Sequence, residues 1–499
     1  MARHFGLAAI ALCGLGGWAI AQAPGVRPPL ILPEPTLPRS VIETLPPPTD
    51  VPPLLPSAPS PASLPPASET LPVATGPEPS APPPATAPAP KASAPLPIPD
   101  GTSPPPPKAP PKPALTIDEV NAKVDALAHK LTVTTGDGEF QLILGGAVVA
   151  DFLYSTKRPV APGTPFFLDP ESPFGFRTNT FDAHARQTNV YALFSGPEVF
   201  DFKTGGFIWV NLYDVSIIRD RYGLLPINAF GELRNDDWRF AAGLQMDVFN
   251  PLNPTVLPFS YLLTSGNVGA YRGQARIERF LHPDEDSQIT LTLAATEPIP
   301  TTINDQLRIS EDNGLPNVEG RWAIGLGPVR GAGLEAHRAI EAGVSAVCGQ
   351  LRTVQGPQRV VADVWGVGAD LRWAASPRWG FQGEVYCGQG IGTYGASALQ
   401  SVNPITFQPI RSCGGWGEMF FYWCGDAVHT HVGYGIDDPR DVDMGPIGPI
   451  RNETCYVTTI WDVTKAFRIG FQASYLRTTY AVPSDVEGFI FHTQFLWKF

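Results

Sequence analysis

The sequence predicts an all-β fold: a transmembrane antiparallel β-barrel of about 16 strands, preceded by a disordered Pro-rich segment and a short coiled-coil-like helix. Three observations predict this fold. Polar and apolar residues alternate along segments of roughly 9 to 16 residues, which are longer than the strands of most soluble proteins. The connections between these segments are alternately tight and long. After residue 23 no apolar stretch suits a membrane helix, so a closed barrel is the remaining way to cross a membrane.

Residues 1–21 have the pattern of a signal peptide. Arg3 and His4 form a positive start, an apolar stretch follows, and the sequence Ala19-Ile20-Ala21 fits an A-x-A cleavage site. We therefore expect the protein to be exported. The formal net charge of -12 argues against a nucleic-acid partner, because phosphate binding requires a basic surface.

The cysteines do not indicate a metal site. Of the 6 cysteines, all but Cys13 follow the leader, and they are Cys348, Cys387, Cys413, Cys424 and Cys455. Their odd number cannot pair completely, and no C-x-x-C pair is present, which argues against zinc. Cys413 and Cys424 would lie too far apart for a disulfide if they share one strand. We expect free, buried thiols, and leave one disulfide open.

Residues 22–114 form a Pro-rich segment that we expect to be a disordered periplasmic spacer. The stretch 24–113 holds 34 of the 57 prolines, and proline has no backbone donor for a helix or a sheet. Such a composition favours extended polyproline II structure over a packed core. The spacer is either a featureless linker or a tether that binds the cell wall.

Residues 115–132 predict a short helix. Thr116 and Glu119 form a capping box. Apolar residues recur at heptad positions, and they are Ile117, Val120, Val124, Leu127 and Leu131. Two heptads are marginally stable alone, so we expect copies from a larger oligomer to associate. The alternative is an amphipathic helix that packs on its own barrel.

Residues 138–499 form the predicted barrel. The strand segments are 139–154, 185–196, 205–217, 226–235, 239–249, 271–280, 288–298, 318–327, 341–351, 360–375, 380–394, 411–423, 427–436, 452–463, 467–480 and 488–499. Tight connections at 235–238, 282–287, 375–379 and 464–467 contrast with long ones at 155–182, 250–268, 298–316 and 436–449. Outer-membrane barrels have short periplasmic turns and long external loops. An even strand count then places both barrel ends in the periplasm.

The alternation separates two faces of each strand. In 239–249, Arg239 and Asp247 lie on one face, and Phe240 and Met246 lie on the other. One face of the last strand carries five aromatic residues, interrupted by a single threonine: Phe489, Phe491, Phe495, Trp497 and Phe499. They predict an aromatic girdle at a membrane edge. A soluble β-sandwich would also alternate, around a dry core. Two segments fit the alternating pattern poorly: Arg477 shares a face with Tyr475, and the segment 418–424 is apolar on both faces.

Four stretches carry a family resemblance: 383–404 (GEVYCGQGIGTYGASALQSVNP), 411–423 (RSCGGWGEMFFYW), 431–439 (HVGYGIDDP) and 493–499 (TQFLWKF). In these the chain resembles DcaP-like outer-membrane porins and related porin-type barrels. The resemblance covers about residues 138 to 499. It implies a sixteen-stranded, trimeric diffusion porin with periplasmic N-terminal helices that form a coiled coil. The long proline segment departs from the family pattern.

The best candidate for a loop that narrows a pore is 250–269, after the fifth strand segment. In diffusion porins a loop after an early strand folds inward, and three prolines would stiffen this one. The constriction-loop candidates are Pro251, Pro254, Pro258 and Tyr261. The alternative is an ordinary external loop that contacts a neighbouring subunit.

Charged and polar residues on the inward faces are the candidate pore lining. They are Arg239, Asp247, Arg272, Gln274, Arg276, Glu278, Asp370, Arg372, Glu384, His429, His431 and Arg468. The five arginines among them would form a basic ladder that draws anions into the channel. The four carboxylates oppose this effect or brace the barrel. We expect a slight preference for anions.

No cofactor or catalytic motif is predicted. The weak metal candidates Asp437, Asp438, Asp441 and Asp443 do not have EF-hand spacing and are better explained as a solvated acidic loop. No persuasive G-x-S-x-G or H-E-x-x-H motif is present. We therefore expect a protein that is not an enzyme, although a lipase-like barrel remains an unfavoured alternative.

These observations together predict an outer-membrane porin for passive diffusion of small hydrophilic solutes. Its partners would be membrane lipid and, as a homotrimer, further copies of itself, with the N-terminal segment in the periplasm. The alternative function is a structural envelope protein whose barrel anchors the Pro-rich tether to the cell wall or another envelope layer.

Overall fold

The computed structural model describes residues 132–134, 140–170, 178–214, 220–298, 314–328, 337–355, 358–423, 427–446, 448–482 and 485–499. The predicted signal peptide, the Pro-rich segment and residues 115–131 of the predicted helix lie outside this range. Thr132, which the sequence assigns to the end of that helix, lies in strand β1 (Thr132–Thr134). No helix among the described residues is long and apolar enough to cross a membrane.

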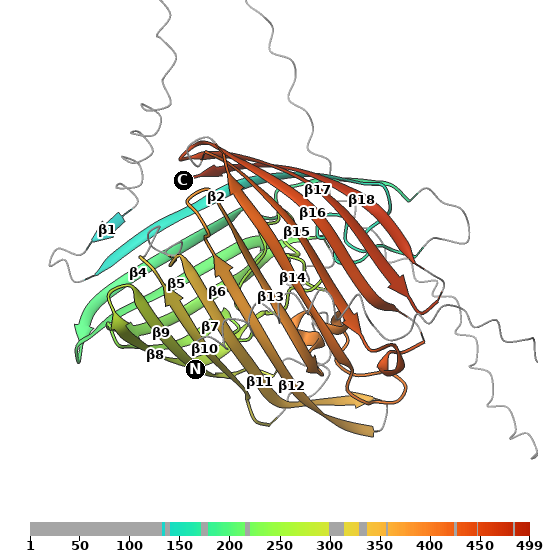
Figure 1. Ribbon diagram of the computed structural model, residues 1–499, viewed down its shortest axis with the longest axis horizontal. Coiled ribbons are helices and arrows are strands. Elements are labelled where there is room, and N and C mark those ends of the chain that lie inside the picture. Colours follow the sequence, from blue (N-terminus) through green and yellow to red (C-terminus); the bar gives the residue numbers. More distant parts are fainter. Residues whose placement is uncertain are drawn as a thin grey trace, which may run out of the picture. The chain divides into compact units, whose positions relative to one another are not determined.

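The described chain forms a closed antiparallel barrel whose wall has 16 strands (Figure 1). The short β3 and the following β4 both pair with the same side of β2, so together they occupy one position in the wall. Strand β18 pairs with β2 and closes the ring, which places the red C-terminal strand beside the cyan β2 in Figure 1. The predicted fold class is therefore confirmed for the barrel.

The wall strands follow the chain in order. Their bounds are β2 Gln141–Ser155, β3 Thr180–His184, β4 Asn189–Val199, β5 Phe202–Tyr213, β6 Tyr222–Arg234, β7 Trp238–Met246, β8 Tyr271–Asp284, β9 Ser287–Thr296, β10 Asn317–Leu326, β11 Ile340–Gln355, β12 Gln358–Trp373, β13 Trp379–Gln389, β14 Arg411–Tyr422, β15 Val428–Pro439, β16 Pro449–Thr464, β17 Phe467–Tyr480 and β18 Val486–Lys498. Each of the sixteen predicted segments overlaps one wall strand.

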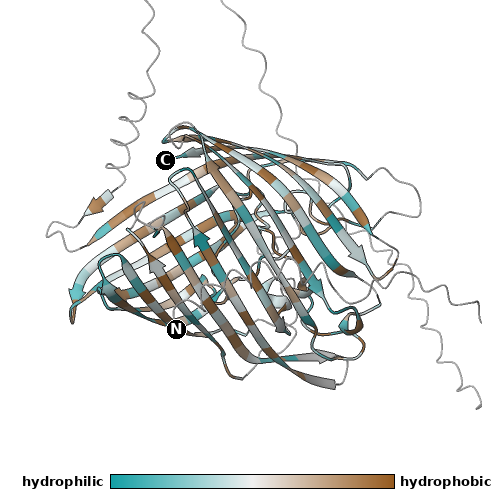
Figure 2. Ribbon diagram, in the orientation of Figure 1, coloured by the Kyte–Doolittle hydropathy of each residue, from teal (hydrophilic) through white to brown (hydrophobic). Residues whose placement is uncertain are grey.

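The alternation of the sequence becomes the two faces of the wall, and apolar and polar colours alternate along the strands in Figure 2. In β18, the outward Phe489 and Phe491 are 51% and 49% exposed, whereas the inward His492 is 2% exposed. Phe499 is also exposed, and its N–H donates to the carbonyl of Gly146 on β2. The last residue thus completes the strand ladder and belongs to the outer face.

Aromatic side chains gather where the short turns join the strands. Trp373 and Trp379 flank the turn between β12 and β13, with ring centroids 6.3 Å apart. Phe467 follows the short turn between β16 and β17 and stacks on Trp497 of β18, with ring centroids 5.3 Å apart. Aromatic rings combine an apolar body with polar edges, so this row suits the boundary between an apolar layer and water.

The two poorly fitting segments have local explanations. Tyr475 and Arg477 both face outward near the long-loop end of β17, where the Tyr475 hydroxyl donates to Glu487 and Arg477 pairs with Asp485. They form a polar row at the rim. In 418–424 the faces do separate: Glu418 and Phe420 are buried inside, and Met419 is exposed outside.

Two predictions need correction. The segment predicted as a strand to residue 394 leaves the wall at Gln389, because Gly390 has a φ of +69° that a strand cannot contain, and 392–394 form a 3₁₀ turn. The expectation of free, buried thiols also needs correction, because the one disulfide that the sequence left open is present and the free thiols among the described residues are exposed. Cys387 and Cys413 are direct partners across β13 and β14 and form a disulfide.

The other described thiols, Cys348 and Cys455, are exposed on the outer face, because they fall on the outward phase of the alternation. Cys424 lies outside the described residues. The pair Cys413–Cys424 considered from the sequence is therefore replaced by a pairing that only strand register could identify.

The exposed apolar side chains of the outer face predict that this face meets an apolar layer. Val457 lies midway along β16 and is 45% exposed on that face. We expect Val457→Arg to lower the free energy of unfolding in lipid vesicles by about 2–4 kcal/mol, because a charge would enter the middle of an apolar layer. Urea unfolding measures this change.

Thr479→Arg is the matched control, since Thr479 lies in register with Arg451 near the long-loop end. There the same substitution should cost about 0–1 kcal/mol. A change within about 0.5 kcal/mol for Val457→Arg would mean that the outer face meets water.

Candidate functional site

The connection between β7 and β8, residues 247–270, lies largely inside the barrel. Most of its residues from Leu257 to Gly269 are buried, although the segment contains no regular strand or helix. Its backbone N–H groups therefore need partners other than a strand ladder. The wall provides these partners along a path that begins at β10 and ends at β17.

Inward carboxylates of the wall accept the N–H groups of the first half of this loop. Glu319 on β10 accepts from Val248 at 2.7 Å, and Glu384 on β13 accepts from Leu252 at 2.6 Å. These two carboxylates are at most 2% exposed. A hydrogen bond from a backbone N–H to a buried carboxylate is charge-assisted and stronger than a neutral one.

Two further wall residues continue this path. Glu418 on β14 accepts the Thr255 N–H at 2.9 Å and the Thr255 hydroxyl at 2.8 Å. The Gln472 side chain on β17 accepts the Leu257 N–H at 2.7 Å. We call Glu319, Glu384, Glu418 and Gln472 the loop anchors. They hold the first half of the loop against one side of the lumen.

The tip of the loop reaches the opposite side of the barrel. Phe259 stacks on Tyr213 of β5 with ring centroids 4.7 Å apart, and Tyr271 of β8 packs against this cluster. Burial raises the pKa of the neighbouring Tyr261 to about 12. The loop thus reaches from the anchors on β13 and β14 to β5 on the other side of the ring, and its tip is fixed by aromatic packing.

The returning half of the loop contains tightly constrained backbone. Gly266 has a φ of +101°, and a Cβ at this position would lie 2.0 Å from the carbonyl oxygen of Gly415. Thr264 has a φ of 73°, an uncommon value for a residue with a Cβ. The Asn452 amide of β16 donates to the Ser265 hydroxyl at 2.7 Å and secures this half.

Two other long connections occupy the same end of the lumen. Phe166 and Phe167 after β2 pack with Ala398 and Leu399 from the connection between β13 and β14. Asp437, from β15, accepts the N–H groups of Ser397 and Ala398 at 3.1 and 2.7 Å. An apolar cluster therefore lies at the long-loop end of the barrel interior, beside the loop 247–270.

The predicted lining residues all lie on inward faces or directly beneath the inner loops, but their environments differ. Those buried to 9% exposure or less are Asp247, Arg272, Gln274, Asp370, Glu384, His429 and His431. Those that keep partial exposure are Arg239, Arg276, Glu278, Arg372 and Arg468. The first group packs against loops or wall, and the second borders the remaining lumen.

Most arginines of the predicted basic ladder are neutralised. Arg272 pairs with Asp247 at 2.6 Å and is fully buried. Arg239 pairs with Glu278 at 3.0 Å, and the same carboxylate lies 3.4 Å from Arg276.

At the other side of the lumen, Arg468 pairs with Asp462 at 2.7 Å. Arg372 differs from the other four. Its Nε is buried without a partner, and no carboxylate among the described residues lies within ion-pair distance of it. Arg372 is therefore the ladder member without a close carboxylate partner in the described part of the chain, although Glu341 of β11 lies in register with it.

The four aspartates considered as weak metal ligands do not converge. Asp437 is buried and binds loop N–H groups, whereas Asp443 pairs with Arg411 at the rim. The hydrogen bond from Arg411 holds the pKa of Asp443 below its usual value. Among the described residues no group of three or more His, Cys, Asp or Glu side chains has the geometry of a metal site.

Sequence reasoning missed Glu319, Glu418 and Gln472 as functional residues, although it assigned their strands. A signal was present: each is a polar residue on the inward phase of a strand, opposite apolar neighbours. The alternation alone shows that such a residue faces the lumen. It does not show that a loop from 60 or more residues away reaches it.

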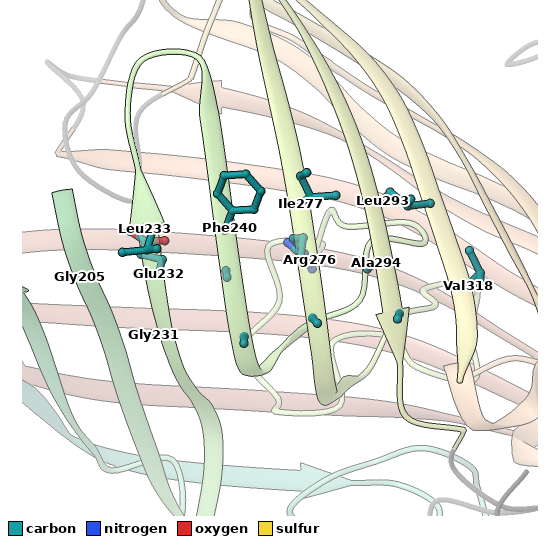
Figure 3. Close-up of a pocket in the computed structure, with 14 residues that line it drawn as sticks. Gly205, Gly231, Glu232, Leu233, Phe240, Arg276, Ile277, Leu293, Ala294 and Val318 are labelled. Carbon is teal, nitrogen blue, oxygen red and sulfur yellow. The ribbon is translucent and has the colours of Figure 1, made fainter. Parts of the chain in front are cut away.

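A surface depression lies outside the lumen (Figure 3). It has a volume of about 760 Å³ and lies on strands β5 to β10. Small residues in register form its floor: Gly231, Ala242, Ala275 and Ala295. Leu233, Phe240, Ile277 and Leu293 form its border. This depression is apolar and belongs to the outer face, so it is not part of the candidate pore.

Comparisons with known proteins agree on the fold. No protein-family model matches the chain, and no curated protein matches its sequence. The outer membrane channel DcaP of Acinetobacter baumannii is similar in structure, with a TM-score of 0.56 and 15% identity over 74% of this chain and 99% of that chain.

Two further solved structures are similar at lower scores. An anion-selective porin from Comamonas acidovorans has a TM-score of 0.47 and 9% identity, over 72% of this chain and 100% of that chain. OmpF of Salmonella typhi, in complex with daunomycin, has a TM-score of 0.45 and 10% identity, over 74% and 100%. The resemblance to DcaP-like porins predicted from the sequence is thus confirmed at the level of the fold.

The returning half of the loop provides a test of its packing. We expect Gly266→Ala to destabilise the folded protein by about 1–3 kcal/mol, because the new methyl group meets a wall carbonyl at a φ that alanine avoids. The loss should appear as a lower midpoint of thermal unfolding in detergent.

Gly231→Ala is the matched control, since a Cβ there has one ordinary contact at 3.8 Å. Its midpoint should stay close to that of the unaltered protein. Equal midpoints for the two variants would contradict the close approach of the loop to β14.

Proposed function

We propose that this protein is an outer-membrane porin through which small hydrophilic solutes diffuse passively. The observation that carries the proposal is the loop 247–270, which lies inside a sixteen-stranded barrel and is held there by the loop anchors. A loop fixed across the lumen restricts the passage and selects solutes by size and charge. In this proposal Pro251, Pro254, Pro258 and Tyr261 belong to the constriction.

The surroundings of the barrel follow from the same proposal. The apolar outer face meets membrane lipid, and the aromatic row beside the short turns marks one edge of the apolar layer. The barrel works as a homotrimer, with its N-terminal segment in the periplasm. It does not act as an enzyme, since passage through the lumen requires no chemical step.

The charge of the lumen favours anions. Four of the five ladder arginines are paired with carboxylates, whereas Arg372 has no described carboxylate within ion-pair distance and is the ladder member whose charge is most available to solutes. A low-dielectric wall focuses the field of such a charge into the channel. Anionic solutes would therefore enter more readily than cations of the same size.

Planar-bilayer recording tests the channel itself. Purified, folded protein should give stepwise increases in current, and removal of residues 24–113 should leave the conductance unchanged because that segment precedes the barrel. Folded protein that inserts without any current would overturn the proposed function.

Arg372→Ala tests the preference for anions. In a KCl gradient, we expect the substitution to reduce the permeability ratio of chloride to potassium by roughly twofold or more. The reversal potential gives this ratio.

Arg279→Ala removes the same charge from the outward phase of β8, where Arg279 pairs with Asp237, and should leave the reversal potential unchanged. If both variants behave like the unaltered protein, Arg372 has no part in selectivity.

A further inference from the structure

Two histidines in the wall connect a loop anchor to the open part of the lumen. His431 and His429 lie on the inward face of β15, and their Nε2 and Nδ1 atoms are 2.8 Å apart. On one side, His431 Nδ1 lies 3.0 Å from Glu418 Oε1. On the other, His429 Nε2 lies 3.8 Å from Asp462 Oδ2. The result is a continuous row: Glu418, His431, His429 and Asp462.

The two ends of this row differ in exposure. The Glu418 side chain is 0% exposed, whereas the Asp462 side chain is 30% exposed and is also paired with Arg468. Protons can therefore enter the row from the lumen at Asp462. The other end is the carboxylate that holds Thr255 of the loop.

Counting hydrogens shows how many protons the row accepts. It has two hydrogen bonds, one between His431 and Glu418 and one between the two rings, whereas His429 Nε2 and Asp462 are 3.8 Å apart, an ion-pair distance. Two neutral imidazoles supply the two hydrogens that these bonds need and leave His429 Nε2 without one. One additional proton takes that position, where it faces Asp462. A second additional proton would place two hydrogens in the 2.8 Å gap between the rings.

The charges around the row favour that single proton. Glu418 is a buried carboxylate, and His431 is the only described side chain within ion-pair distance that can carry a positive charge. Asp462 is already offset by Arg468 and faces Lys498. The charged and titratable groups that interact with the rings or with the two end carboxylates are Glu418 and Tyr422 of β14, Tyr456 and Asp462 of β16, Arg468 of β17 and Lys498 of β18.

We infer that His429 and His431 together bind one proton, and that this proton strengthens the anchoring of the loop 247–270 by Glu418. Histidine is the side chain whose charge ordinarily changes between pH 5 and 8. With the proton bound, Glu418 has a cationic partner, and Thr255 is held firmly. As the pH rises and the proton leaves, Glu418 becomes a buried anion without a cation, and the loop anchor weakens. Any effect on passage rests on the function proposed above.

Two measurements on the folded barrel in detergent test this inference without requiring a channel. Nuclear magnetic resonance of protein labelled at histidine should show that His429 and His431 titrate together, with one proton taken up by the pair between pH 8 and 5. Two independent steps that add two protons, or no step in this range, would overturn the inference.

Amide hydrogen exchange tests the link to the loop. After correction for intrinsic rates, we expect the Thr255 amide to exchange roughly tenfold more slowly at pH 5.5 than at pH 8, because its acceptor gains a cationic partner. His431→Gln should abolish this difference, and Glu418→Gln should abolish it in the same way. His282→Gln, at an exposed position of β8, is the control and should retain it.

The outcomes separate the two proposals. If the histidine pair titrates as expected but His431→Gln keeps the pH-dependent exchange of Thr255, the link to the loop is wrong. Should His431→Gln fail to fold, His429→Gln provides the same test, because it also removes one ring from the row. A folded barrel that conducts no current would overturn the channel, and would leave these two readouts unaffected.

Discussion

The constraint on which this structure depends is that every wall strand must pair on both sides. The ring closes because β18 pairs with β2, so the described wall has no open edge. On a face that meets an apolar layer, an unpaired backbone N–H or carbonyl would cost several kcal/mol. Closure removes this cost for the whole wall. The inward face then becomes available for polar side chains, which a solid core would exclude.

The same requirement explains the position of the inner loop. Residues 247–270 form no ladder of their own, so their N–H groups would be unpaired inside the barrel. The loop anchors satisfy them, and the loop in turn adds donors to carboxylates that also accept hydrogen bonds from wall side chains. Loop and wall therefore stabilise each other through one set of hydrogen bonds. This mutual dependence helps to explain how the wall tolerates Glu319, Glu384 and Glu418 at less than 5% exposure.

Pairing also changes what the inward charges can do. The composition of the inward faces suggests a ladder of five arginines, but neighbouring strands bring carboxylates against four of them. An arginine with a close carboxylate partner braces the wall and contributes little net field. Arg372, which has no carboxylate within ion-pair distance among the described residues, and the hydrogen-bonded histidine pair on β15 are the exceptions. Function is therefore expected to depend on few of the inward residues.

The sequence by itself determined the barrel, the number of its strands and the face on which each side chain lies. Polar and apolar residues alternate with a period of two along each strand, and this local pattern shows which side of the strand meets an apolar layer. It also indicated the loop 250–269 as the segment to examine. Gly390 marks the end of β13 through its positive φ, but the sequence alone does not show this, because a glycine within a strand has several explanations.

Only the tertiary structure decided which residues meet across the ring. The disulfide between Cys387 and Cys413 depends on the register between two strands. The hydrogen bond from the Thr255 N–H to Glu418 joins residues that are 163 positions apart in the chain. Neither contact leaves a trace in local composition, because any inward carboxylate would show the same alternation. Distances around a closed ring depend on both strand order and register. The partner of a side chain is therefore set by the fold of the whole wall, whereas the face on which the side chain lies is set by its own position in the strand.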